Sequence, residues 1–160
     1  MAHEPNFVEK ILGWIPGYKG YADKELRRDS DRLLREALVR SLEPARTSVD
    51  AAIAECSRSM AFTHLEGLEA LRRRIATLSD RLKLAPGGYS GFFDTVKIKE
   101  AQLDAIAAHD AGFRELTNRV ASACAALETP DRDRIRRANS ELDALDAGLR
   151  RREDLLKDLV

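Results

Sequence analysis

His109 and Asp110 are adjacent residues whose types could carry acid–base chemistry or hold a metal ion. The other histidines, His3 and His64, do not stand at Glu-x-x-His or His-x-x-x-His spacing with them. A metal site in a helical bundle needs Glu on two helices and Glu-x-x-His on two more, and the sequence lacks that set. We therefore predict no catalytic residue, no metal ligand and no cofactor.

Asp110 instead falls on the apolar stripe of a helix. Leu103, Ile106 and Phe113 flank it at spacings of three and four, which is the period of one helix face. We predict a buried or half-buried carboxylate that bonds an arginine or an aromatic hydroxyl and fixes the helix register. A ligand-binding or enzymatic bundle around His109 and Asp110 is kept as an alternative hypothesis.

Two segments share the pattern Gly-Tyr-x-Gly-aromatic-x-Asp, at residues 17–23 and 88–94. Glycine permits sharp turns, and Asp23 and Asp94 are placed to cap the helices that follow. The interpretation favoured here is that the aromatic side chains plug one end of a bundle. The alternative is an aromatic binding surface. In either case the residues concerned are Trp14, Tyr18, Tyr21, Tyr89, Phe92 and Phe93.

The elements around these corners are predicted to be helices. Hydrophobic residues make up 44 % of the chain and charged residues 34 %. Leucine or isoleucine recurs every three or four positions from Leu65 to Leu82, and leucines recur at spacings of three, four or seven from Leu142 to Leu159. These patterns predict an all-α fold, an antiparallel bundle of about four long helices preceded by a short N-terminal helix. Residues 1–160 are expected to form one domain, with residues 1–21 as the N-terminal segment and residues 84–98 as the central corner.

Helix boundaries follow from local signals. Pro44 is expected to kink a helix that runs to about residue 57, in preference to ending it. Residues 57–63 are the expected turn, with Thr63 as an N-cap, although an unbroken helix from 45 to 83 also fits. One helix is predicted from Leu103 to Leu127, and Thr129 is predicted to cap the last helix.

Residues 6–21 allow two interpretations. The segment could fold over the bundle as a lid, or it could lie in a membrane interface with Trp14 at the headgroups. Pro16 and Gly17 are expected to stop its short helix. The lid is favoured, because one Glu and one Lys make a poor polar face for lipid binding.

Charge and cysteine content restrict the function classes. Basic and acidic residues number 27 each, so the chain has no overall field for nucleic acid. No apolar run reaches the length of a membrane span, and the N-terminus lacks a signal-peptide pattern. Cys56 and Cys124 are expected to be reduced core residues, and the expected location is cytoplasmic.

The sequence resembles small all-helical bacterial proteins of uncharacterised function. The likeness lies in Gly-Tyr-Lys-Gly-Tyr, Arg27-Arg28-Asp29 and Gly-Tyr-Ser-Gly-Phe-Phe-Asp. It implies an all-helical fold and no particular activity. The leading hypothesis is a non-enzymatic helical interaction or adaptor module with an unknown protein partner. A peripheral membrane protein anchored through residues 6–21 is the alternative. Leu155 and Val160, which lie off the main leucine stripe of the last helix, also suggest a two-fold homodimer.

Overall fold

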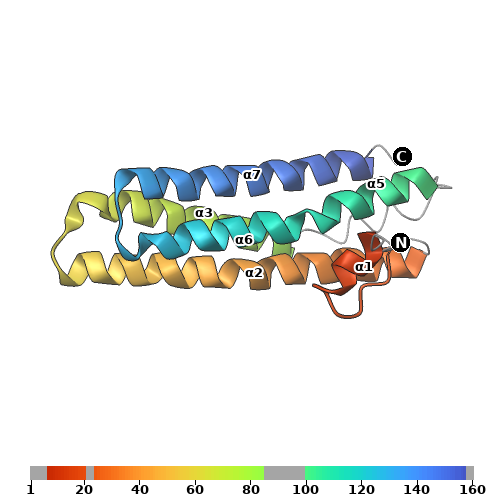
Figure 1. Ribbon diagram of the computed structural model, residues 1–160, viewed down its shortest axis with the longest axis horizontal. Helices are drawn as coiled ribbons and strands as arrows, with labels where there is room; N and C mark the ends of the chain where they lie inside the picture. The colour runs from red at the N-terminus through yellow and green to blue at the C-terminus, as the bar shows by residue number, and fades with distance from the viewer. Residues whose placement is uncertain (1–6, 21–23, 85–99, 158–160) are drawn as a thin grey trace, which may run out of the picture.

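The computed structural model describes residues 7–20, 24–84 and 100–157. Within these ranges the chain forms helices joined by turns, and the predicted all-α bundle is confirmed (Figure 1). The elements are α1 Phe7–Leu12, α2 Lys24–Arg58, η1 Phe62–His64, α3 Leu65–Leu84, α5 Glu100–Ala111, α6 Phe113–Ala125, η2 Ala126–Glu128 and α7 Arg132–Lys157.

The helices α2, α3, α6 and α7 lie side by side, and successive ones along the chain run in opposite directions (Figure 1). The long helix α2 packs mainly against α3 and α6, while α6 packs against α7. The pair α3 and α7 closes the ring with a looser contact. The helix pair α5 and α6 forms one column, and α1 lies across the end of the bundle against α5. The antiparallel pairing of α2 with α3 and of α6 with α7 agrees with the short connections that join them.

The core consists of the leucine seams that the sequence predicts. On α3 the seam residues Leu68, Leu71 and Ile75 are fully buried, and on α7 Leu145 and Leu156 are buried too. Each buried leucine or isoleucine side chain contributes about 1.5–3 kcal/mol relative to exposure in water. Side-chain burial therefore supplies most of the stability of these helices.

Pro44 lies inside α2, and the helix continues through it to Arg58. The prediction that the helix runs past Pro44 to about residue 57 is confirmed. Pro44 is exposed while Ala45 is buried, so the proline ring sits on the solvent side. On that side the missing backbone hydrogen bond can be replaced by water.

The predicted single helix from Leu103 to Leu127 is wrong. The helix is interrupted at Gly112. The amide of Gly112 donates a hydrogen bond to the carbonyl of His109, three residues earlier, at 3.0 Å. A Cβ added to Gly112 would lie only 3.2 Å from that carbonyl oxygen, so the turn favours glycine. The break divides the column into α5 and α6.

Three smaller boundary predictions also need correction. The short helix α1 ends at Leu12, before Pro16. Thr63 lies inside the 3-10 helix η1, and the residue at the N-cap of that element is Ala61. The first turn of α7 is capped by Asp131, whose Oδ1 accepts a hydrogen bond from the amide of Arg134 at 2.8 Å, and not by Thr129. That bond lowers the pKa of the Asp131 carboxyl, against a smaller opposing effect of burial. Capping depends on backbone geometry that residue spacing alone does not specify.

Candidate functional site

Asp110 belongs to a buried cluster of charged side chains at the end of the bundle covered by α1. Its carboxylate is 0 % exposed and accepts a hydrogen bond from Nε of Arg152 at 2.8 Å. Nη1 of Arg152 donates to Oδ1 of Asp31 at 2.7 Å, and Oδ2 of Asp31 accepts from Nε of Arg35 at 2.9 Å. Nη1 of Arg35 donates to the backbone carbonyl of Leu82 at 3.2 Å. The cluster therefore joins α2, α3, α5 and α7.

Among the described residues, this cluster contains two carboxylates and two guanidinium groups, whose formal charges balance. Transfer of such charges from water costs several kcal/mol per ion, and the cost is offset only where each charge has well-placed partners. Hydrogen bonds to charged groups are the stronger kind, and an arginine fork matches a carboxylate. The geometry suits a structural role, because any slip of α7 along α2 or α5 would separate these partners. The arginine partner predicted for Asp110 is present.

Sequence reasoning identified Asp110 and missed its partners. Arg152 falls between Leu149 and Leu156 at spacings of three and four, and Asp31 precedes Leu34 at a spacing of three. Both charges therefore stand on the apolar stripe of their own helix. That position is the signal that could have revealed them.

The cavity beside the cluster is too small for a substrate. It has a volume of about 50 Å³ and is lined by Leu34, Leu38, Leu82 and Leu149 together with Arg35, Arg81, Arg152 and Glu153. Ligand pockets usually measure roughly 300–1,000 Å³, whereas this volume suits a few water molecules. The cluster offers no space in which a reacting molecule could approach Asp110 by this route.

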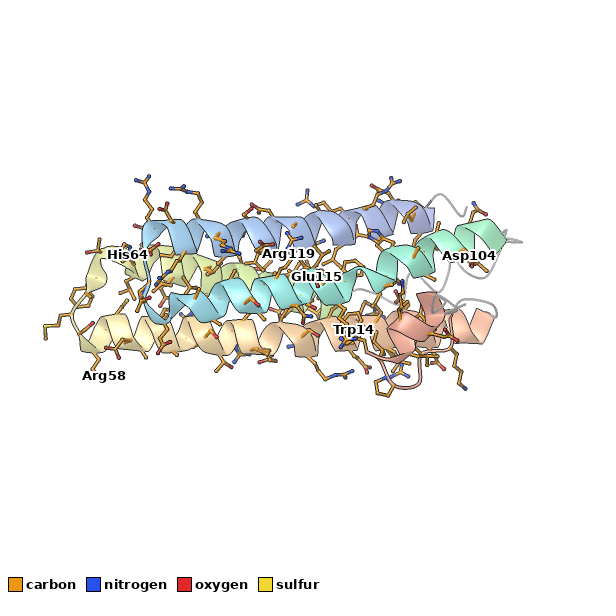
Figure 2. The ribbon with its side chains drawn as sticks, viewed as in Figure 1. Trp14, Arg58, His64, Asp104, Glu115 and Arg119 are labelled. Carbon is orange, nitrogen blue, oxygen red and sulfur yellow. The ribbon has the colours of Figure 1, made fainter. Side chains whose placement is uncertain are left out.

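The side chain of His109 contacts α7 and Phe113. Its Nε2 donates to the backbone carbonyl of Gly148 at 2.8 Å, and its ring meets Phe113 edge-on with the ring centres 5.2 Å apart. His109 thus ties α5 to α7 and covers an aromatic ring. His64 is labelled at the opposite end of the bundle (Figure 2).

The N-terminal aromatic corner packs on the bundle as a lid. Tyr18 is 0 % exposed and Trp14 is half-buried, and the side chains of Ile11 and Ile15 are fully buried. Gly17 adopts a φ of +83°, a left-handed backbone conformation that glycine adopts without steric strain. The residues that a membrane anchor would insert are thus largely in the core. The other predicted corner residues, Tyr21, Asp23, Tyr89, Phe92, Phe93 and Asp94, lie outside the described residues, and so does most of the central corner 84–98.

The turn between α2 and α3 carries two exposed apolar residues. The sequence predicted a turn here, at residues 57–63, but did not identify these residues as a candidate site. We use the term apolar tip for Met60 and Phe62, whose side chains are 78 % and 58 % exposed. The amide of Ala61 donates to the carbonyl of Cys56 at 2.9 Å, and that of Met60 donates to Ser57 at 3.4 Å. These two bonds form a Schellman motif, which places Met60 at the position where a left-handed residue is needed. Its φ is +54°, and glycine is the usual residue there.

A groove between α3 and α7 is bridged by ion pairs. It has a volume of about 390 Å³, with Ala70, Leu78 and Leu142 among its lining residues. Arg74 binds Asp143, and Arg81 binds Asp146 at 2.6 Å. Burial raises the pKa of Asp146, but hydrogen bonds from Arg81 and Arg150 bring it below its ordinary value. The groove charges are therefore largely satisfied within the chain.

Searches for a metal site, for a membrane-spanning helix and for related proteins assign no function to this chain. In the part of the chain that the structure describes, no three His, Cys, Asp or Glu side chains gather as a metal site. None of the helices within 7–20, 24–84 and 100–157 combines the length and apolar character needed to cross a membrane. Comparisons with protein-family models, with curated proteins and with solved structures found no match for this chain.

Proposed function

We propose that the protein is a non-enzymatic interaction module that inserts the apolar tip, Met60 and Phe62, into an apolar cleft of a partner protein. One observation carries this proposal. A methionine occupies a left-handed position that favours glycine, and the turn holds its side chain and the neighbouring Phe62 in solvent.

The energetics of the tip support a binding role. A residue other than glycine in the left-handed region costs about 1–2 kcal/mol. The exposed Met60 and Phe62 side chains also forgo burial energy of about 1.5–3 kcal/mol each. A partner with an apolar cleft would recover that burial energy. Local strain of this kind is concentrated at functional sites in proteins.

Charge around the tip favours a protein cleft over an anionic membrane. Arg58, labelled in Figure 2 at the end of α2, pairs with Glu55 at 2.5 Å. At the start of α7, Arg134 pairs with Asp131 and Arg136 with Asp133. Because these three arginines have acidic partners, they add little positive potential with which to hold anionic lipid.

Two further observations favour interaction over catalysis and over self-association through α7. The buried cluster around Asp110 is paired and adjoins only a small cavity. The leucines of α7 from Leu142 to Leu156 are buried or half-buried within one chain. They therefore need no second copy to cover them.

Site-specific photo-crosslinking tests the proposal. A photoreactive phenylalanine analogue replaces Phe62 in the full chain expressed in its own cells, and the same analogue at the exposed Ala76 on α3 serves as control. We expect one discrete protein adduct from position 62 and none from position 76. Binding to that purified partner should weaken about 30-fold in Met60→Ser/Phe62→Ser, the loss of a binding hot spot.

Leu12→Ser is the matched control for loss of exposed apolar surface. Leu12 is 44 % exposed and lies on α1, at the other end of the bundle. The Leu12→Ser variant should bind the partner as tightly as the unmodified chain does. Equal adducts at 62 and 76, equal weakening by Leu12→Ser, adducts only with a second copy, or crosslinking only to membrane lipid would each reject the proposal.

A further inference from the structure

The sulfur atoms of this chain differ sharply in exposure. The sequence has two methionines, Met1 and Met60, and two cysteines. Met60 is 78 % exposed, whereas Cys56 is 3 % and Cys124 is 0 % exposed. Both cysteines are free thiols. Burial also raises the pKa of the Cys124 thiol to about 11, which keeps it in the protonated, unreactive form.

We propose that Met60 is a reversible oxidation site through which a hydroperoxide releases the docked partner. The inference rests on the proposed function of the apolar tip. The thioether sulfur attacks one peroxide oxygen, the S–O bond forms as the O–O bond breaks, and water or an alcohol leaves. The thioether is oxidised by two electrons to the sulfoxide, and the peroxide is reduced.

The position of Met60 confines the effect of this reaction to the tip. The turn is held by backbone hydrogen bonds of Met60 and Ala61, and neither bond uses the sulfur. A sulfoxide on an exposed side chain therefore leaves the bundle intact. It does convert a flexible apolar side chain into a polar one, and an apolar cleft binds a polar group poorly.

Methionine at position 60 fits this role better than glycine or leucine would. Glycine would relieve the backbone strain but supply no side chain. Leucine would supply similar apolar volume but could not be oxidised. Methionine combines the burial energy of a large apolar side chain with reversible oxidation, which leucine does not. Met60→Leu is therefore the matched variant for testing the inference.

The first arm of the test measures the chemistry without a partner. The full chain and a synthetic peptide of residues 57–63 are treated with hydrogen peroxide, and peptide mapping by mass spectrometry separates Met60 from Met1. We expect Met60 sulfoxide to form within about threefold of the peptide rate, as exposure governs susceptibility. Cys56 and Cys124 should stay unmodified, and the urea midpoint should not change. A rate more than about tenfold slower than the peptide, or earlier cysteine oxidation, overturns the site.

The second arm measures the consequence. Stoichiometric oxidation should shorten retention on a phenyl matrix and weaken binding to the partner crosslinked at position 62 by about tenfold or more. Treatment with methionine sulfoxide reductases should restore both, and Met60→Leu should resist peroxide in both assays. Unchanged binding after full oxidation overturns the regulatory inference and leaves the proposed function standing. If no partner binds even the unoxidised chain, the proposed function fails and the regulatory inference falls with it.

Discussion

Nε of Arg152 on α7 donates a hydrogen bond to Oδ1 of Asp110 on α5 across 2.8 Å, and neither side chain is more than 5 % exposed. Asp31 binds the same guanidinium from α2. One arginine thus connects three helices in the core. The relationship leads to two predictions about stability.

Asp110→Ala should lower the free energy of unfolding by about 3–5 kcal/mol, because it leaves a buried arginine without one of its two carboxylates. Urea unfolding followed by circular dichroism measures the loss. The matched control is Asp143→Ala, which removes the exposed partner of Arg74 and should cost less than about 1 kcal/mol. Losses of similar size in the two variants would show that the Asp110 pair is no stronger than a surface pair.

The losses from Asp110→Ala and Arg152→Ala should not add. Once one partner is gone, removal of the other also removes an uncompensated buried charge. We expect the double variant to be about 1–3 kcal/mol more stable than the sum of the single losses predicts. The four unfolding free energies of the double-mutant cycle decide this, and simple additivity would mean that the two side chains act independently.

Met60→Gly should raise the free energy of unfolding by about 0.5–1 kcal/mol. Glycine removes a left-handed strain of about 1–2 kcal/mol, partly offset by the greater entropy of the unfolded chain. Ala61→Gly is the control, because Ala61 has a φ of −89° and should instead be destabilised by about 0.4–1 kcal/mol. Thermal and urea unfolding measure both variants. A destabilised Met60→Gly would mean that the methionine side chain stabilises the turn, against the binding role proposed for it.

Cys124 should make stability depend on pH in the alkaline range. Burial raises the pKa of its thiol from 9.0 to about 11. The folded state therefore holds the proton more tightly than the unfolded state, so the contribution is complete below pH 9 and is lost as pH rises towards 11. The loss should reach about 1 kcal/mol by pH 10. The difference in free energy of unfolding between the unmodified chain and Cys124→Ala, measured at pH 8 and at pH 10, isolates the contribution of this thiol. Parallel curves of stability against pH for the two proteins would contradict the prediction.

The fold class was predictable because helix periodicity is a local property. The leucine spacing along α3 and α7 specified which faces would be buried, and a polar residue on such a stripe, Asp110, could be identified as a core carboxylate. The turn after residue 57 was also predictable from the end of one stripe and the start of the next. These features depend on residues within one or two helical turns.

The partners of Asp110 and the exposure of Met60 were decided by the tertiary structure. Arg152 and Asp31 lie 121 positions apart in the chain, and only the relative rotation and register of α7 and α2 bring their side chains to 2.7 Å. Met60 and Phe62 are apolar in the sequence, yet the turn between α2 and α3 leaves them 78 % and 58 % exposed. A sequence gives the composition of each helix face, but which face meets another helix depends on how all the helices pack together, because burial is a property of the whole assembly.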